Sequence, residues 1–149
     1  MADTRSLFHH ILVPTDGSEA SIKAGKLAVR LAYCHEARLT FVYVVDDAVA
    51  GGLADATRQE VHHVQDELEQ GGQRYLNYLT RLAAGVKLAS NQVIRKGEPY
   101  EEISALAREQ SVDLIVIGQV GRRGLRRILI GSVTERVIEH APCPVMIVK

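Results

Sequence analysis

Two kinds of hydrophobic pattern alternate along the chain. Short runs of apolar and β-branched residues predict strands buried on both faces, as parallel strands are, and they occur at 9–13, 39–45, 113–117 and 144–148. A less apolar run at 86–95 predicts a further strand at an edge of the sheet. Between these runs, apolar residues recur at the spacing of an amphipathic helix, over residues 19–37, 55–84, 100–110 and 133–140.

Strands that alternate with helices predict an α/β fold. We expect a single-domain, doubly wound, five-stranded parallel sheet of order 3-2-1-4-5 with helices on both faces, over residues 7–149, after a short flexible tail at 1–6. The segment 55–84 is expected to be one helix with a weak point at Gly71-Gly72, because each internal glycine costs roughly 1 kcal/mol relative to alanine. Residues 46–53, which include Gly51-Gly52, are expected to form a mobile loop.

The composition narrows the function classes without naming one. Charged residues make up 24% of the 149 residues and apolar residues 46%, as in soluble globular domains. The formal net charge of zero favours neither nucleic acid nor an anionic membrane as a partner. No apolar run reaches the length of a membrane span, and the start lacks the apolar core of a signal peptide, so a cytoplasmic protein is expected. Cys34 and Cys143 are too few for a disulfide framework, and we expect them to be packing thiols.

A glycine-rich segment at 118–132, GQVGRRGLRRILIGS, joins the fourth strand to the last helix. Glycine permits positive φ and lets a ligand approach the backbone, while a helix N-terminus offers unpaired N–H groups to an anion. The segment contains no acidic residue, and guanidinium groups grip phosphate through paired hydrogen bonds. Its arginines are Arg122, Arg123, Arg126 and Arg127. These features favour a nucleotide site.

The same glycines also fit a purely structural interpretation, in which they end a strand and form turns. Ser132-Val-Thr-Glu135 matches a capping box, in which Ser132 and Glu135 would satisfy each other's backbone amides. That arrangement would leave fewer amides for a ligand and would put a carboxylate nearby. The glycines alone do not decide between the two interpretations.

Other strand ends support the ligand interpretation. Ligands of doubly wound sheets bind beyond the carboxyl ends of the strands, where the winding direction reverses. The expected strand order brings Pro14-Thr15-Asp16, Val44-Val45-Asp46 and Gly118 to one such cleft. Asp16 there can accept hydrogen bonds from ribose hydroxyls, although Asp16-Gly17-Ser18 is also a standard turn in which Asp bonds its own backbone. Val44 is suited to give adenine an apolar slot with a backbone partner.

Several motifs together resemble the universal stress protein (UspA) family, in its ATP-binding single-domain form. They are ILVPTDGS at 11–18, Val44-Val-Asp46, KGEP at 96–99, DLIVIG at 113–118, Gly118-x2-Gly121-x9-Gly131-Ser132 and APCPVMIVK at 141–149. The resemblance implies a Rossmann-like fold of the adenine nucleotide alpha hydrolase type and a regulatory role in the stress response. It also implies a homodimer, often formed by antiparallel pairing of the final strands, here Val145–Val148.

The resemblance also implies which residues contact ATP. Pro14, Thr15 and Asp16 would flank adenine and ribose, and the Val44 backbone would face adenine. Ribose and phosphates would be wrapped by Gly118, Gln119, Val120, Gly121, Arg122, Arg123 and Gly124, and the phosphate nest would be completed by Gly131, Ser132, Val133 and Thr134. Gln119 stands where many members have Ser, Thr or Ala. Mg²⁺ or Mn²⁺ is expected on the phosphates, without a dedicated carboxylate cage.

The function we favour is regulatory: ATP occupancy orders the arginine loop at 122–127 and so alters a dimer or partner surface. No general base or water-positioning residue is evident, so we expect slow turnover if any and assign no catalytic residue. Two alternatives stay open, a slow ATP hydrolase or adenylyl or phosphoryl transferase in the same cleft, and a nucleotide-free dimeric adaptor. His62 and Asp66 have the spacing of a metal clasp but lack a third ligand.

Overall fold

The computed structural model describes residues 6–120 and 130–149, and in this part five parallel strands form one sheet. Their order is β3-β2-β1-β4-β5, so the predicted α/β architecture and strand order are confirmed. The third strand lies at an edge, also as predicted. The strands are β1 (His10–Pro14), β2 (Arg38–Asp46), β3 (Asn91–Gly97), β4 (Leu114–Gly118) and β5 (Val145–Val148).

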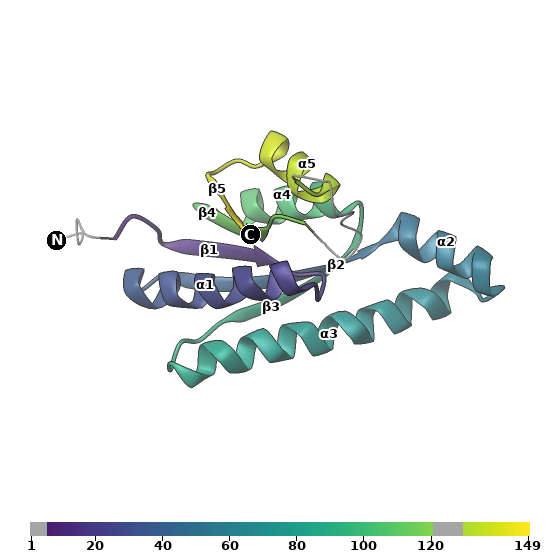
Figure 1. The fold of residues 1–149 in the computed structure, drawn as a ribbon, viewed down its shortest axis with the longest axis horizontal. Coiled ribbons are helices and arrows are strands. Elements are labelled where there is room, and N and C mark those ends of the chain that lie inside the picture. The colour runs from purple at the N-terminus through teal and green to yellow at the C-terminus, as the bar shows by residue number, and fades with distance from the viewer. Residues whose placement is uncertain (1–5, 121–129) are drawn as a thin grey trace.

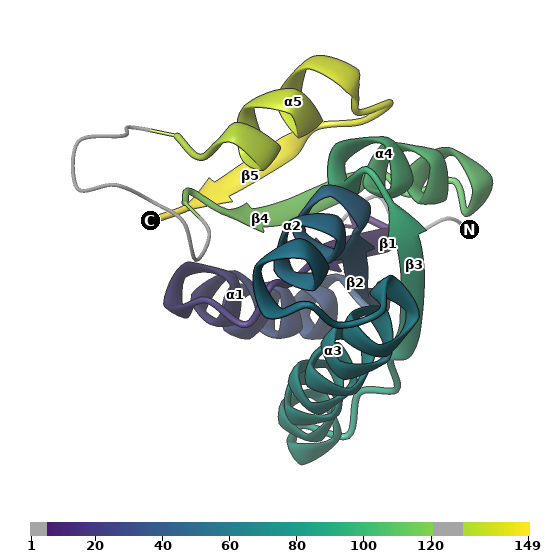
Figure 2. The same cartoon turned by 90° about the vertical axis from the view of Figure 1, so that its right-hand side faces the viewer.

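Helices cover both faces of the sheet (Figure 2). One face carries α1 (Glu19–His35) and α3 (Val61–Gly85), and the other carries α4 (Pro99–Glu109) and α5 (Ser132–His140). Within residues 6–120 and 130–149, no helix combines the length and apolar character that a membrane span needs.

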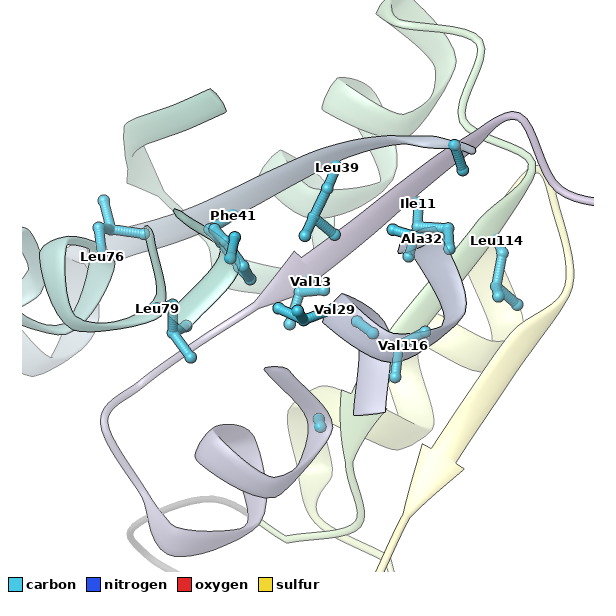
Figure 3. Close-up of a cluster of buried hydrophobic side chains, with 14 residues drawn as sticks. Ile11, Val13, Val29, Ala32, Leu39, Phe41, Leu76, Leu79, Leu114 and Val116 are labelled. Atoms are coloured by element: carbon cyan, nitrogen blue, oxygen red, sulfur yellow. The ribbon is translucent and has the colours of Figure 1, made fainter. Parts of the chain in front are cut away.

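The core has two halves because successive residues of a strand point to opposite faces. Ile11 and Val13 of β1 pack with α1 and α3, whereas Leu12 packs with α4. Figure 3 shows the first half, in which Leu76 and Leu79 of α3 point toward the strand residues. Burial on both faces explains why the central strands are continuous apolar runs.

The prediction of a mobile loop at 46–53 was wrong, because this stretch forms most of a helix, α2 (Asp47–Thr57). Asp46 caps it, with its side chain accepting hydrogen bonds from the backbone N–H groups of Ala48 (2.9 Å) and Val49 (3.2 Å). Ala50 and Ala54 are buried against Val64 of α3. This packing outweighs the poor helix propensity of the glycine pair, which faces open space. Helix α2 and the start of α3 extend beyond the carboxyl ends of the strands (Figure 1).

The predicted single helix over 55–84 was wrong at its beginning. Helix α2 ends at Thr57, its C-cap Arg58 adopts the left-handed conformation with φ 54°, and α3 begins at Val61. Helix α3 then continues without a break through the glycine pair at 71–72. A Cβ at Gly72 would overlap the ring of Tyr43, so this glycine is where a β2 side chain rests on the helix.

The third strand begins later than predicted, at Asn91 rather than at residue 86. Residues 86–90 instead form a turn and a connection, and Lys87 adopts a left-handed conformation with φ 59°. The strand extends to Gly97 because it pairs with β2 as far as Asp46.

The two cysteines differ in their surroundings. Cys143 packs against the second half of the core, and this burial raises the pKa of its thiol. Cys34 lies exposed on α1, so the prediction of a packing thiol was wrong there. Position 34 is the last residue but one of α1, beyond Ala32, the last buried residue of the helix.

Candidate functional site

A pocket of about 370 Å³ opens at the carboxyl end of the sheet. Strand β1 pairs with β4 only up to Leu12 and with β2 only up to Pro14, so the chains on either side of β1 separate beyond these residues. This is the point where the winding direction of the sheet reverses, and doubly wound folds bind their ligands there.

Most of the residues predicted for the site line this pocket. They are Pro14, Thr15, Asp16, Val44, Gly118, Val120, Gly131, Ser132, Val133 and Thr134. Gln119 does not line it, and its backbone serves the fold instead: its N–H donates to Val148 O and its C=O accepts from Gly131 N, both at 2.8 Å. The predicted contacts at Gly121, Arg122, Arg123 and Gly124 lie outside the described residues, as do Arg126 and Arg127.

The pocket also contains residues that sequence reasoning did not assign to the site. They are Ser18, Ser21, Val42, Tyr43, Asp46, Val49, Leu68, Pro99, Ile103 and Ile117. Several adjoin predicted strand ends and could have been assigned from the rule that ligands of doubly wound sheets bind beyond the carboxyl ends of the strands, where the winding direction reverses. Val49 and Leu68 were not, because they come from the pair of helices α2 and α3, where a loop and a different helix start were expected.

The turn after β1 is tightly hydrogen-bonded. Asp16 accepts a hydrogen bond from Ser18 N–H (2.9 Å), and the Ser18 hydroxyl oxygen accepts one from Ser21 N–H (3.2 Å), capping α1. Thr15 shares a hydrogen bond with the Ser21 hydroxyl at 2.9 Å. The local turn role considered for Asp16 is therefore present. It is compatible with a ligand role, because a carboxylate has acceptor sites for several donors.

Helix α5 starts differently. Its N-cap is Gly131, without a side-chain capping bond, so the capping box considered for Ser132 and Glu135 does not form. Gly131 N–H is held by Gln119 O, and the Thr134 hydroxyl donates to Gly118 O at 2.8 Å, which places Ser132 inside the first turn. The N–H groups of residues 132–134 have no partner within the helix. They lie at the pocket, at the positive end of the helix dipole.

Gly118 has a structural reason to be glycine. A Cβ at this position would lie 2.8 Å from the backbone carbon of Ala20 and 2.9 Å from the nitrogen of Ser21. Both are main-chain atoms that cannot move aside cheaply. The end of β4 therefore needs glycine to pack against the first turn of α1, in addition to lining the pocket.

The end of β2 presents backbone groups to the pocket. Thr15 N–H donates to Val42 O at 2.9 Å, so Val42 directs its peptide groups toward β1. Because direction alternates along a strand, the N–H and C=O of Val44 point to the same side, where β1 has ended. One donor and one acceptor thus lie side by side, and Ile103 and Ile117 provide apolar surface in the same pocket.

Within the part of the chain that the structure describes, no group of three or more His, Cys, Asp or Glu side chains is arranged to hold a metal ion. At the pocket, both Asp16 and Asp46 already accept backbone N–H groups. On the long helix, His63 pairs with Glu67 at 3.3 Å. The described side chains therefore form no metal cage at the pocket or on the long helix.

Comparison with known proteins agrees with this geometry. The model of the universal stress protein family matches residues 7–149. Universal stress protein MJ0531 of Methanocaldococcus jannaschii is 39% identical over 146 residues, which cover 97% of this chain and 84% of that protein. The structure of universal stress protein UspA from Lactobacillus plantarum is 30% identical with a TM-score of 0.83, and the match covers 95% of this chain and 98% of that one.

Two more distant relatives were solved with adenine nucleotides. A universal stress protein in complex with cAMP is 24% identical with a TM-score of 0.73, and the match covers 97% of this chain and 99% of that one. A universal stress protein from Archaeoglobus fulgidus in complex with dAMP is 22% identical with a TM-score of 0.71, covering 95% and 98% of the two chains. At these identities the likeness shows a shared fold.

Proposed function

The chain belongs to the universal stress protein family, and we propose that it is a regulatory, stress-response protein that binds ATP or another adenine nucleotide. The observation that carries the proposal is one pocket in which the Val44 backbone, the Asp16 carboxylate and the uncapped start of α5 converge. These three features match the three parts of a nucleotide: base, ribose and phosphate.

The base would lie against the end of β2. The Val44 N–H can donate to adenine N1, and its C=O can accept from the adenine amino group. Guanine carries an acceptor in place of that amino group, so the same pair of backbone groups would oppose it. The apolar walls of the pocket, including Val42 and Ile117, suit a flat aromatic ring.

The ribose and phosphates would follow along the pocket. Asp16 would accept hydrogen bonds from the ribose hydroxyls, as acidic residues do in dinucleotide-binding folds. The N–H groups of Ser132, Val133 and Thr134 would bind phosphate oxygens at the positive end of α5. Mg²⁺ or Mn²⁺ would be held by the phosphate oxygens, because the described residues offer no carboxylate cage.

Two further parts of the proposal concern assembly and location. The outer edge of β5 carries the apolar residues Val145–Val148, and an apolar strand edge is commonly covered by another strand. We therefore propose a homodimer that pairs these edges. We place the protein in the cytoplasm.

The relatives solved with cAMP and dAMP support adenine as the base of the ligand, without selecting the number of phosphates.

The test is calorimetric titration of nucleotide-stripped protein with ATP and Mg²⁺, and with GTP in parallel. We expect micromolar binding of ATP and at least about tenfold weaker binding of GTP, since one reversed hydrogen-bond pair costs about 1–3 kcal/mol. Gly131→Val adds a branched side chain at the N-cap of α5, which lines the pocket, and is expected to weaken ATP binding by about tenfold or more. Gly85→Val is the matched control, because a Cβ at Gly85 meets open space.

Other outcomes distinguish the alternatives. A wild-type protein that binds no adenine nucleotide would leave a nucleotide-free adaptor as the better interpretation. Substantial single-turnover hydrolysis of bound ATP, lost in Asp16→Asn, would replace the regulatory role with an enzymatic one. Equal binding of ATP and GTP would contradict the role given to the Val44 backbone.

A further inference from the structure

We propose that Tyr75 of α3, which does not line the pocket, positions the turn that grips the ribose and so sets how strongly the site recognises ribose hydroxyls. The proposal rests on the adenine nucleotide site described above. It assigns a binding role to the long helix, whose residue Tyr75 acts through Gly17 rather than by touching the ligand.

The contact between Tyr75 and Gly17 is direct. Gly17 has φ 79°, a left-handed conformation that favours glycine, and a Cβ there would overlap the Tyr75 ring. Gly17 stands between Asp16 and Ser18, both of which line the pocket. The ring therefore packs against the backbone of the turn at its residue with positive φ. Any movement of the ring changes the space in which Asp16 is held.

A second aromatic ring fixes the position of the first. The centroid of the Tyr43 ring lies 6.3 Å from that of Tyr75, with the two planes tilted by 54°, a distance at which aromatic rings attract. Tyr43 comes from β2 and lines the pocket. It rests on Gly72 of α3, where a Cβ would overlap its ring. The two tyrosines and two glycines thus join α3, β2 and the ribose turn in one packed contact.

Next to Tyr75, helix α3 is packed into the hydrophobic core. Leu76 and Leu79 are fully buried in the first half of the core (Figure 3). Leu79 also packs on Gly25 of α1, where a Cβ would be too close to its side chain. Residues 72, 75, 76 and 79 share one face of the helix, at spacings of three and four. The core therefore fixes the Tyr75 ring, and the ring in turn restrains the turn.

This arrangement predicts a selective effect on the ligand. The phosphates would contact the start of α5, and the base would contact the Val44 backbone, which pairing with Arg95 of β3 holds in place. Loosening the turn should weaken the hydrogen bonds between Asp16 and the ribose hydroxyls and leave the remaining contacts in place. A merely structural role for Tyr75 would instead lower the affinity for every nucleotide equally.

The experiment compares ATP with 2′,3′-dideoxyATP, both with Mg²⁺, by calorimetry. In the wild type, ATP should bind about tenfold or more tightly than the dideoxy analogue, as expected for hydrogen bonds to a carboxylate. Tyr75→Leu should reduce that ratio by about fivefold or more, while changing the affinity for the dideoxy analogue less than about twofold. Tyr75→Phe keeps the ring that packs on Gly17, so a ratio lost in this variant would contradict the role given to the ring. Tyr78→Leu, at an exposed position of the same helix, is the matched control.

An unchanged ratio in Tyr75→Leu, or an equal loss for both ligands, would overturn the inference and leave the proposed function intact. Failure of the wild type to bind either ligand would overturn both. A second measurement needs no variant: ATP should slow amide hydrogen exchange at 72–79 of α3 more than the dideoxy analogue does, because coupling between the turn and the helix is reciprocal. Equal protection by the two ligands would contradict the coupling.

Discussion

The amino and carboxyl ends of the parallel sheet treat their polar groups in opposite ways. At the amino end, Asp113 accepts hydrogen bonds from the backbone N–H groups of His9 (2.7 Å) and His10 (3.0 Å). The buried His10 ring contacts Gln110 O at 3.1 Å and the Thr40 hydroxyl at 2.8 Å. At the carboxyl end a pocket opens instead. The polar groups at the amino end satisfy one another, whereas at the carboxyl end the Val44 backbone and the first N–H groups of α5 face the pocket.

Helix starts at the carboxyl end show the same contrast on a smaller scale. Helix α1 is capped by Ser18 and α2 by Asp46, each through a side-chain acceptor. The N-cap of α5 is Gly131, which has no side chain that could accept a hydrogen bond. Among these three, only α5 has no N–H group bonded to an N-cap side chain, and this difference follows from the residue at each N-cap.

The largest effect is expected for Gly118, which lines the pocket and also packs against α1. Gly118→Val should lower the free energy of unfolding by about 3 kcal/mol, because overpacking against main-chain atoms costs about 1–3 kcal/mol and valine adds more than one carbon. Urea denaturation of the variant, with Gly85→Val as control, measures it. A change below about 0.5 kcal/mol would mean that the contact between β4 and α1 adjusts freely.

A smaller effect is expected at the amino end. Asp113→Ala removes the acceptor for two backbone N–H groups and should lower the free energy of unfolding by about 2 kcal/mol. ATP affinity should stay within about twofold of the wild type, since the two ends are separated by the full length of the strands. Denaturation and calorimetry on one preparation test both halves. Loss of ATP binding in a folded Asp113→Ala protein would contradict the inference that the amino end of the sheet stabilises the fold without affecting the pocket.

The smallest effect concerns pH. Burial, the largest cause, together with the nearby Arg38, lowers the pKa of His10, although the Gln110 carbonyl and Asp113 act in the opposite direction. The unfolded chain therefore binds a proton at a higher pH than the folded one does. The His10 contribution to stability is present above the ordinary histidine pKa of about 6.5 and is lost as pH falls below it.

For a single proton the slope is at most about 1.4 kcal/mol per pH unit. Urea denaturation between pH 7.5 and 5 should show this decline in the wild type and a weaker one in His10→Gln, which does not ionise. Identical pH profiles would show that other groups account for the decline. Nucleotide affinity should follow neither profile, because His10 lies at the end of the sheet away from the pocket.

Hydrophobic pattern was sufficient for the sheet and insufficient for α2. Burial on both faces leaves continuous apolar runs, so the strands could be predicted, apart from the bounds of the less apolar β3. Helix α2 could not, because its stability depends on Ala50 and Ala54 packing on α3 and on the Asp46 cap. From the sequence of the segment alone, the pair Gly51-Gly52 favoured a loop, and the contribution of the packing and of the cap was not visible. The same limitation hid Val49 and Leu68, which line the pocket from this pair of helices.

The candidate site divides in the same manner. The rule that ligands bind where the winding direction reverses located the strand ends Pro14 to Asp16, Val44 and Gly118, since this rule depends only on strand order. The start of α5 was harder to predict, because Ser132 fits a capping box by sequence. Two contacts with the segment at 118–119, from Gly131 N–H and the Thr134 hydroxyl, set the helix start one residue earlier.

The sequence by itself determined most of the strands, most of the helices and the strand ends that line the pocket, because the apolar periodicity that marks these elements is carried by local residue types. Only the tertiary structure decided what several glycines do. Gly118 faces α1, Gly72 supports Tyr43, and Gly17 lies under Tyr75. At each of these glycines the missing Cβ makes room for a residue from a distant part of the chain. The sequence around the glycine therefore does not predict which residue packs against it.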